Sequence, residues 1–165
     1  MTRLSAIQAD ITTLEVDAIV NAANNAMRGG GGVDGAIHAA GGPAVLADCI
    51  ARFPEGLATG DAGWTIAGDL PARWIIHTVG PNRRAGQTDA ALLESCYRRS
   101  LEVADELGAR EVAFPLIGAG VYGWSKGDSV AAAVRAVEAG SFEVEHVLLV
   151  GYDDGARREI EAALG

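Results

Sequence analysis

The sequence predicts a layered α/β domain with a largely parallel sheet, and three observations support this fold class. Apolar runs rich in branched residues recur along the chain, as they do in buried strands. Segments with apolar residues at the helical spacing i, i+3 and i+4 lie between these runs. With 165 residues, 49% hydrophobic and 21% charged, the chain can bury one sizeable core but is short for two domains. We therefore expect one domain over residues 1–165.

Each element follows from its own local pattern. The expected strands, all apolar, are Leu4–Ile7, Val16–Val20, Trp64–Ala67, Trp74–Val79, Val112–Ile117 and Val144–Val150, of which Trp64–Ala67 has the weakest pattern. The expected helices, judged from spacing and from the caps Thr88 and Asp128, are Val33–Ala40, Pro43–Arg52, Thr88–Leu107, Lys126–Glu138 and Gly155–Leu164. The glycine-rich segment Phe53–Asp69 is expected to run over the surface before the strand at Trp74.

Charge and composition disfavour several classes of partner. The net charge of -9, from 13 basic and 22 acidic residues, disfavours a general attraction to nucleic acid or to an anionic membrane. No apolar run is long enough to span a bilayer and no leader pattern begins the chain, so the expected location is the cytoplasm. Cys49 and Cys96 are isolated, which suits a reducing compartment. His38, His77 and His146 lack metal-ligand spacing, so we expect no metal and no cofactor. His77 lies within the apolar run Trp74–Val79, which predicts a core role. We also expect a monomer.

The stretch Asn21–Gly35 places asparagines, four consecutive glycines and a carboxylate between an apolar run and a helical pattern. Glycine loses more conformational freedom on folding than any other residue, so four in a row indicate a backbone that something requires. The usual requirement is a phosphate bound by bare backbone N–H groups. Such a site suits an anionic ligand in an acidic protein, because it needs no positive charge.

A second glycine loop, Gly118–Gly127, follows the strand at Val112–Ile117 and leads into a helix. It matches G-x-G-x-x-G and G-x-S-x-G, but too few elements follow it for a dinucleotide-binding domain. A serine hydrolase would need Ser125, Asp128 and His146, and the acid lies too close to the serine to orient the histidine. A tight strand-to-helix turn is the plainer interpretation. Because loops at the carboxyl ends of parallel strands converge, the two glycine loops together predict a clamp for a diphosphate.

Two polar residues flank the first glycine loop. Asn24 cannot act as a base, but its amide can fix a ribose hydroxyl or a water, while Asp34 can accept a proton. Each residue also has a structural interpretation. Asn24 fits an Asx-turn at the strand end, and Asp34 fits a helix N-terminal carboxylate worth about 0.3–1 kcal/mol.

Four further residues suggest contacts to a base and a sugar. Asp10 follows the first strand, where it can cap a turn or accept a hydrogen bond from an exocyclic amine such as adenine N6. Tyr152, beyond the last strand, can stack on that base, although partial burial in a loop is the plainer interpretation. Tyr122 and Trp124 lie within the second loop, where an aromatic ring would pack on the ligand's sugar.

Taken together, these residues resemble the macrodomain family of ADP-ribose-binding modules, and within it the MacroD-type hydrolases. The matching segments run in order over nearly the whole chain: Gln8–Thr12, Val16–Asn24, Gly29–Gly35 with Ile37 and His38, Thr59–Gly60, Leu70–Ala72, Ile76–Pro81, Phe114–Pro115 and Gly120–Gly123. As a set they are highly specific, whereas either glycine loop alone is a weak signal.

The resemblance implies a three-layer α/β/α sandwich with a mixed sheet of about six strands, which binds ADP-ribose above the strand ends. Asp10 would hold adenine N6 with the Ile11 backbone beside it, and Tyr152 would lie near the adenine. Asn24 would orient the distal ribose, and Asp34 would assist the attacking water. The implied phosphate loops are Gly30, Gly31, Gly32 and Val33, and then Gly118, Ala119, Gly120, Val121 and Tyr122.

The activity implied by the resemblance is removal of mono-ADP-ribose from acidic side chains, with related hydrolysis of O-acetyl-ADP-ribose. Its partners would be ADP-ribose and proteins modified on Asp or Glu, and either Asp34 or a substrate phosphate would take the proton from water. Family members often carry a serine or threonine where this chain has Gly118-Ala119, so a hydroxyl to the phosphate is missing. That departure motivates one alternative, a reader that binds ADP-ribose without turnover. A phosphatase acting on ADP-ribose 1″-phosphate is the other.

Overall fold

The computed structural model describes residues 1–165, and its six strands confirm the predicted order. They are β1 (Arg3–Gln8), β2 (Ala18–Ala23), β3 (Ala62–Ile66), β4 (Trp74–Val79), β5 (Glu111–Phe114) and β6 (His146–Gly151). The strand predicted at Val112–Ile117 ends at Phe114, because Pro115 has no N–H to continue the ladder. The weak pattern at Trp64–Ala67 corresponds to β3, which lies within the segment predicted to run over the surface.

Five α-helices connect the strands, and two of their predicted caps are wrong. The helices are α1 (Gly32–Gly41), α2 (Pro43–Arg52), α3 (Ala90–Leu107), α4 (Lys126–Ala139) and α5 (Asp154–Leu164), with short 3-10 turns η1 (Ile11–Thr13) and η2 (Arg83–Ala85). Asp89, not Thr88, caps α3 and accepts a hydrogen bond from Ala91 N. Ser125 caps α4 by accepting one from Asp128 N. In both cases the short side chain just before the helix reaches a free N–H of the first turn.

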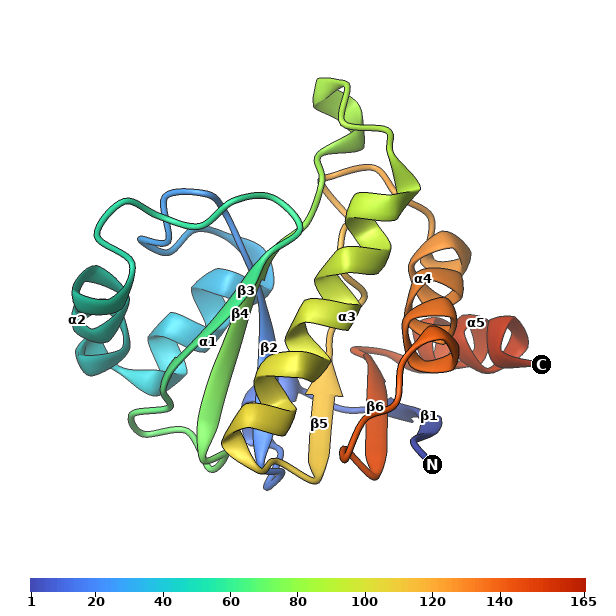
Figure 1. Ribbon diagram of the computed structural model, residues 1–165, viewed down its shortest axis with the longest axis horizontal. Helices are drawn as coiled ribbons and strands as arrows, with labels where there is room; N and C mark the ends of the chain where they lie inside the picture. Colours follow the sequence, from blue (N-terminus) through green and yellow to red (C-terminus); the bar gives the residue numbers. More distant parts are fainter.

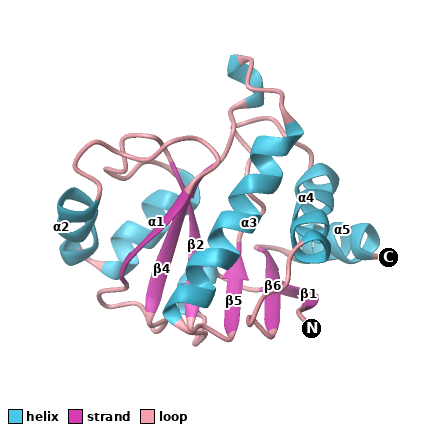
Figure 2. Ribbon diagram, viewed as in Figure 1, coloured by secondary structure: helices cyan, strands magenta, loops and turns pink.

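The strands form one mixed sheet in the order β1-β6-β5-β2-β4-β3, in which only β3 is antiparallel to its neighbour. Helices α3, α4 and α5 pack on one face of the sheet and α1 and α2 on the other (Figures 1 and 2). The predicted three-layer α/β/α sandwich is therefore confirmed. None of its helices combines the length and the apolar character needed to cross a membrane.

Alternation along the strands divides the core into two layers. In β2, Ala18 and Val20 belong to the layer under α3, α4 and α5, whereas Ile19 belongs to the layer under α1 and α2. Asn21 lies opposite His77 in the register of β2 and β4, and both follow the parity of Ile19. The period-two geometry of strands therefore places a polar pair beneath the helix that follows the first glycine loop.

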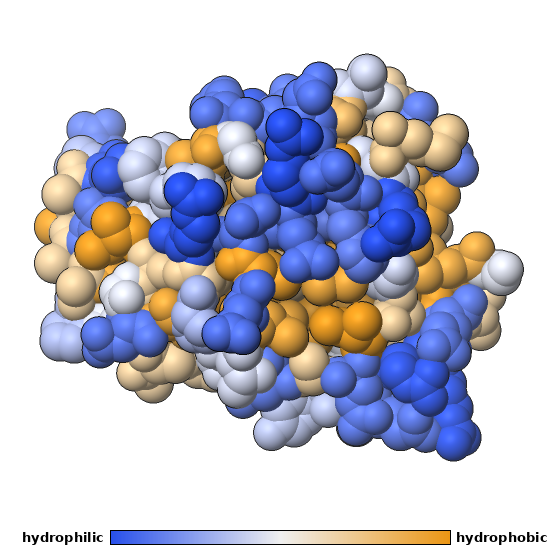
Figure 3. Space-filling model, turned by 90° about the horizontal axis from the view of Figure 1, so that it is seen from below, coloured by the Kyte–Doolittle hydropathy of each residue, from blue (hydrophilic) through white to orange (hydrophobic).

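The carboxyl ends of the five parallel strands lie at one edge of the sheet, at the top of Figure 1. The loops that leave this edge include both glycine loops. Figure 3 shows the opposite end of the molecule, where hydrophilic residues surround patches of hydrophobic ones. The edge at the carboxyl ends is where an open α/β sheet binds its ligands.

Candidate functional site

Every candidate site residue lies in a loop or first helical turn that follows the carboxyl end of a parallel strand. Asp10 follows β1, Tyr152 follows β6, and Asn24 follows β2. The second glycine loop follows β5 and the first follows β2, and these two strands are neighbours. Read along the sheet, the candidates run from Asp10 and Tyr152, through the second glycine loop, to Asn24 and the first glycine loop.

The first glycine loop, Gly29–Gly35, opens α1 with a bare backbone. Gly31 occupies the N-cap position, so the first N–H groups of α1 have no side-chain partner. A Cβ on Gly31 or Gly32 would meet nothing within 4 Å, whereas one on Gly35 would lie 2.6 Å from the Gly30 carbonyl oxygen. The loop therefore folds back on its own helix where only glycine fits, and leaves the helix N-terminus open to an anion.

The two carboxylate oxygens of Asp34 have different surroundings. Asp34 is 5% exposed, and its Oδ1 accepts a hydrogen bond from Asn21 Nδ2 at 2.8 Å. The same oxygen lies 3.4 Å from His38 Nε2. Its Oδ2 faces the glycine loop, because a Cβ on Gly30 would lie 3.1 Å from that oxygen and 3.3 Å from Asn24 Nδ2. The structure thus brings Asn24 and Asp34 to the same point of the loop.

A buried chain of hydrogen bonds runs from Asp34 into the core. Asn21 Nδ2 donates to Asp34 Oδ1 and to His77 Nδ1, the latter at 3.1 Å. His77 Nε2 lies 2.8 Å from Thr65 Oγ1, and that hydroxyl donates to the Ile66 carbonyl oxygen. Because the hydroxyl proton is already used, His77 must donate from Nε2 and accept at Nδ1. Hydrogen-bond donation therefore runs outward from Asn21, to Asp34 on one side and through His77 and Thr65 to the Ile66 carbonyl oxygen on the other.

His77 is a neutral core histidine, as the sequence predicts. Burial, and to a lesser extent the nearby His38, lower its pKa to about 3. The orientation of the Asn21 amide is fixed as a result, although its Oδ1 is buried with no partner. The reverse orientation would set that oxygen against the carboxylate of Asp34, which is the more costly arrangement.

The Asn24 side chain also shapes the first glycine loop. Its Oδ1 accepts from Met27 N at 3.3 Å, and its Nδ2 donates to the Gly29 carbonyl oxygen at 3.1 Å. The turn-forming interpretation of Asn24 is therefore confirmed. The second hydrogen of Nδ2 has no acceptor within the chain, so the fold does not use it.

Arg28 fastens the same loop to the rest of the molecule. Its guanidinium donates to the backbone oxygens of Ala26, Met27, Phe53 and Pro54 at 3.1–3.3 Å. A hollow of about 340 Å³ lies beside it, lined by Arg28, Gly29, Gly30, His38, Ala39, Gly42, Pro43 and Leu46. The loop is thus held from both sides, by Asn24 within it and by Arg28 across to residues 53–54.

The second glycine loop is held by backbone hydrogen bonds and by Trp124. Trp124 N donates to the Gly118 carbonyl oxygen at 3.1 Å, and its indole Nε1 donates to the Pro81 carbonyl oxygen at 2.9 Å. Trp124 is only 6% exposed, so the prediction that it packs on a ligand is wrong. Tyr122 is half-buried, and Val121 is 81% exposed. The second glycine loop thus has one of its two aromatic residues packed in the core.

Asp10 and Tyr152 supply an acceptor and an exposed ring at the other end of the row. Asp10 caps η1, because its Oδ1 accepts from Thr12 N at 3.0 Å and from Thr12 Oγ1 at 2.7 Å, while Oδ2 is free. The capping role of Asp10 is therefore confirmed. Tyr152 is 79% exposed, so the expectation of partial burial is wrong. Ile11, the residue after Asp10, is buried and anchors the η1 backbone.

The serine-hydrolase alternative is excluded by geometry. Ser125 Oγ is used as the cap of α4. His146 begins β6 at the opposite end of the sheet, where its Nε2 lies 2.8 Å from Ser5 Oγ. No group of three or more His, Cys, Asp or Glu side chains is placed to hold a metal ion.

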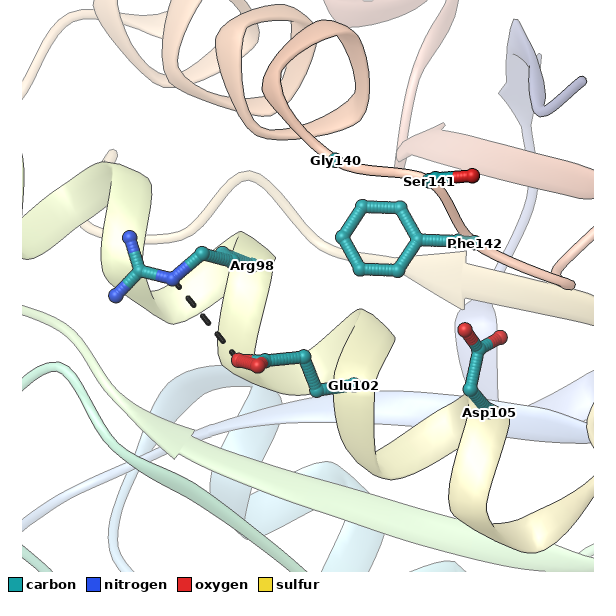
Figure 4. A pocket seen from close by; sticks show the side chains of 6 residues that line it. All are labelled: Arg98, Glu102, Asp105, Gly140, Ser141 and Phe142. Atoms are coloured by element: carbon teal, nitrogen blue, oxygen red, sulfur yellow. Dashed lines mark ion pairs between the residues drawn. The ribbon is translucent and has the colours of Figure 1, made fainter.

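A second hollow lies away from the glycine loops, between α3 and the segment before β6 (Figure 4). It has a volume of about 360 Å³ and is lined by Arg98, Glu102, Asp105, Gly140, Ser141 and Phe142. The Asp105 carboxylate accepts from Glu143 N and Val144 N, and Arg98 pairs with Glu102 at 3.9 Å. Because its charged groups have partners within the chain, this hollow holds no candidate for chemistry.

Two residues near Asp34 escaped the sequence analysis as site residues. Asn21 lies inside an apolar strand, and its partner His77 is 56 residues away, so only the strand register reveals the pair. In the sequence His38 looks like one of three scattered histidines. Its spacing of four residues from Asp34 on a predicted helix is the signal that could have found it.

Comparisons with known proteins show which family the chain is similar to. A family model described as Macro domain matches residues 20–133. A macro domain-containing protein of Streptomyces coelicolor is 51% identical over 169 residues, which cover 100% of both chains. An O-acetyl-ADP-ribose deacetylase of Klebsiella pneumoniae is 49% identical over 154 residues, which cover 90% of this chain and 88% of the relative. The crystal structure of a Trypanosoma brucei macrodomain in complex with ADP-ribose has a TM-score of 0.88 and 34% identity, over 98% of this chain and 69% of that chain.

Proposed function

Because the chain belongs to the macrodomain family, we propose that residues 1–165 form a single macrodomain that binds ADP-ribose and hydrolyses its esters. The substrates are mono-ADP-ribose on acidic side chains and, as a related ester, O-acetyl-ADP-ribose. The observation that carries the proposal is the meeting of Asn24 with the free oxygen of a buried Asp34 at the first glycine loop. The relatives named O-acetyl-ADP-ribose deacetylase support ester hydrolysis, and the complex of a structural neighbour supports the ligand.

The order of the strands matches the order of groups in ADP-ribose. Neighbouring strands lie about 4.8 Å apart, so the three steps from β1 to β2 span about 14 Å. In the proposed complex the adenine lies at the β1 and β6 ends, where Asp10 Oδ2 accepts from N6 and the exposed ring of Tyr152 lies beside the base. The distal ribose then lies at the β2 end, beside Asn24.

The diphosphate lies between, where both glycine loops offer backbone N–H groups. The first loop contributes the open N-terminus of α1, at Gly30, Gly31, Gly32 and Val33. The second contributes the backbone of Gly118, Ala119, Gly120, Val121 and Tyr122, of which Ala119 N also donates to the Leu116 carbonyl oxygen at 3.2 Å. Fixed N–H groups bind the negative charge without a cation, which suits a chain of net charge -9.

Hydrolysis needs a water positioned at the ester of the distal ribose and a group that takes its proton. In the proposed reaction the spare hydrogen of Asn24 Nδ2 and the free Oδ2 of Asp34 hold that water between them, which the nearness of both atoms to Gly30 supports. Asn21 holds Oδ1, so the carboxylate presents one chosen oxygen to the loop. General-base help of this kind is typically worth about 10²–10⁴-fold in rate.

Release of ADP-ribose from a glutamate-modified protein tests the hydrolase. We expect wild type to release it, and Asp34→Ala to lower kcat by about 10²–10⁴-fold with little change in ADP-ribose affinity. Asp128→Ala is the matched control, because it removes another first-turn aspartate that is exposed and whose side chain makes no hydrogen bond or ion pair. Asp34→Asn distinguishes the two proton acceptors, since near-normal turnover in that variant would assign the proton to a substrate phosphate.

One observation favours a second candidate, a reader that binds without turnover. The Asn24 amide is already engaged with the loop backbone, and Gly118-Ala119 offers no hydroxyl to the phosphate. Binding of ADP-ribose with no release from the modified protein would support the reader and sink the hydrolase. Phosphate release from ADP-ribose 1″-phosphate, with no ester hydrolysis, would instead indicate the phosphatase.

Calorimetry with ADP-ribose tests the ligand itself. Asp10→Asn keeps an oxygen to cap η1 but can present an NH₂ group where the carboxylate accepts from adenine N6, so we expect weaker binding by roughly tenfold. The comparison with wild type therefore isolates base recognition from the fold of η1. Undetectable binding by wild type would contradict the hydrolase and the reader together.

A further inference from the structure

Most basic side chains of this acidic protein are paired, which makes the unpaired ones informative. Eight of the 13 basic residues form ion pairs with carboxylates. The five that form none are Arg3, Arg28, Arg73, Arg83 and Arg84. The Arg28 guanidinium donates to backbone oxygens, and Arg3 and Arg73 lie at the amino end of the sheet. Only Arg83 and Arg84 offer free positive charge at the carboxyl ends of the strands.

Arg83 and Arg84 stand on the segment that follows β4, residues 82–87, which we call the arginine loop. Figure 1 shows this segment in yellow-green, projecting above the strand ends. Both arginines are exposed, and neither side chain makes a hydrogen bond within the chain. Gln87 N donates to the Asn82 carbonyl oxygen at 3.0 Å, and Asn82 N donates to Gln87 Oε1 at 2.7 Å. These bonds close the loop and fix the place of its two charges.

The arginine loop is fastened to the second glycine loop. Arg83 N donates to the Tyr122 carbonyl oxygen at 2.9 Å, and the Arg83 guanidinium lies 5.3 Å from the centre of the Trp124 ring. The Arg84 side chain lies across Gly123, where a Cβ would come within 2.8 Å of Arg84 Cγ. The two positive charges are therefore held beside the proposed ligand rather than at a distant surface.

The sheet order places the arginine loop at one particular end of the ligand. In the proposed complex ADP-ribose runs from β1 to β2, with its distal ribose at the β2 end. The next strand beyond β2 is β4, from which the arginine loop departs. The bond to a modified protein is made at the distal ribose, so in the proposed complex the arginine loop lies at the end of the ligand to which the polypeptide is attached.

We propose that the arginine loop binds the polypeptide that carries ADP-ribose, through acidic residues that flank the modified carboxylate. This inference rests on the proposed function and names its macromolecular substrate class. A chain of net charge -9 repels acidic polypeptides, and two free arginines at the exit of the site offset that repulsion locally. Exposed ion pairs of this kind are modest and screened by salt, so the effect lies in substrate capture rather than in the chemical step.

The test compares two peptides, each with one ADP-ribosylated glutamate, flanked in one by aspartates and glutamates and in the other by serines and alanines. With Arg83→Gln/Arg84→Gln we expect kcat/KM for the acidic peptide to fall roughly three- to tenfold at low salt. The neutral peptide and O-acetyl-ADP-ribose should change less than about twofold. Added salt should remove the difference between wild type and variant.

Arg3→Gln/Arg73→Gln is the matched control, because it removes two unpaired positive charges at the other end of the sheet. An equal loss in this control would show that only net charge matters and would overturn the proposal. An equal loss with O-acetyl-ADP-ribose would also overturn it, since the arginines would then act on ADP-ribose itself. Stronger competition from an oligonucleotide than from a glutamate-rich peptide would reassign the loop to phosphate polymers.

Binding separates this inference from the proposed hydrolysis. The dissociation constants of free ADP-ribose and of the modified acidic peptide can be measured without turnover. If wild type binds both but hydrolyses neither, the hydrolase fails, and the arginine loop still predicts that only peptide binding weakens in Arg83→Gln/Arg84→Gln. If wild type binds no ADP-ribose, both proposals fail.

Discussion

The two glycine loops leave neighbouring strands and offer the same backbone groups, yet they are built on different supports. Behind the first loop lies the buried polar chain from Asp34 through Asn21 to His77. Behind the second lie the ring of Trp124, backbone hydrogen bonds, and two buried hydroxyls at the root of the loop. Ile117 N donates to Tyr97 Oη and the Ile117 carbonyl oxygen accepts from Ser129 Oγ, so this support holds backbone and presents no charged group to the loop. The difference indicates a division of labour, in which the first loop positions chemical groups and the second supplies only N–H donors.

The largest expected effect comes from cutting the support of the first loop. Asn21→Leu fills the space but leaves the Asp34 carboxylate and His77 Nδ1 without their donor. We expect a loss of about 3–5 kcal/mol in the free energy of unfolding, measured by urea denaturation. Asn25→Ala, an exposed asparagine of the same turn, should cost much less. Equal stability of the two variants would show that the polar chain does not support the loop.

A matched pair of glycine substitutions compares the helix starts after the two loops. Gly35→Ala sets a methyl group 2.6 Å from the Gly30 carbonyl oxygen, so we expect about 2 kcal/mol of destabilisation and weaker ADP-ribose binding. Gly127→Ala, in the first turn of α4, meets only Ser125 Oγ at 3.9 Å. It should be neutral or stabilise by about 0.4–1 kcal/mol. Tight ADP-ribose binding by Gly35→Ala would show that the first loop tolerates displacement.

The buried histidine gives the first loop a pH dependence that the second lacks. Folding lowers the pKa of His77 from 6.5 to about 3, so between those values the unfolded chain binds a proton that the folded chain refuses. Stability should therefore fall as pH falls below about 6.5, by about 1.4 kcal/mol per unit, or about 2 kcal/mol by pH 5. His77→Gln should be less stable at pH 7 but flatter with pH in denaturant titrations. An unchanged slope would contradict the buried neutral histidine.

The smallest effect is expected from adding a side chain to the second loop. Ala119→Ser supplies the hydroxyl that family members often carry at this loop, and we expect roughly two- to tenfold tighter ADP-ribose binding by calorimetry. Ala39→Ser, at an exposed position of α1, is the control for a surface hydroxyl. No gain at Ala119 would indicate that the backbone N–H groups already satisfy the diphosphate.

Local sequence predicted the elements well where one pattern decided the outcome. Trp74–Val79 and Pro43–Arg52 have their predicted bounds, because an apolar run and a proline at the first helical position act locally. The predicted caps Thr88 and Asp128 are wrong, since several residues near the start of each helix can act as caps and only backbone geometry chooses among them. The prediction that Trp124 packs on a ligand is wrong for a related reason, because the indole binds the carbonyl oxygen of Pro81, 43 residues away.

The candidate site divides in the same way. Both glycine loops and the approach of Asn24 to Asp34 could be predicted, because glycines and strand ends are visible in one dimension. The tie from Asn21 to His77 could not, because it depends on how β2 and β4 align. The arginine loop was invisible for the opposite reason. Arg83 and Arg84 look like any surface arginines until every other basic residue has been matched with its partner.

The order of strands has a consequence for discrimination among nucleotides. Because the proposed ligand extends across four neighbouring strands, from β1 to β2, the length of the ligand must match that stretch of the sheet edge. AMP and ADP would fill the β1 end but leave Asn24 without a sugar. The third phosphate of ATP cannot replace the missing ribose. Free adenine nucleotides, which share the recognised base, would thus compete with ADP-ribose for only part of the site. The spacing of the strands, rather than any single side chain, would then select a nucleotide long enough to carry a second sugar.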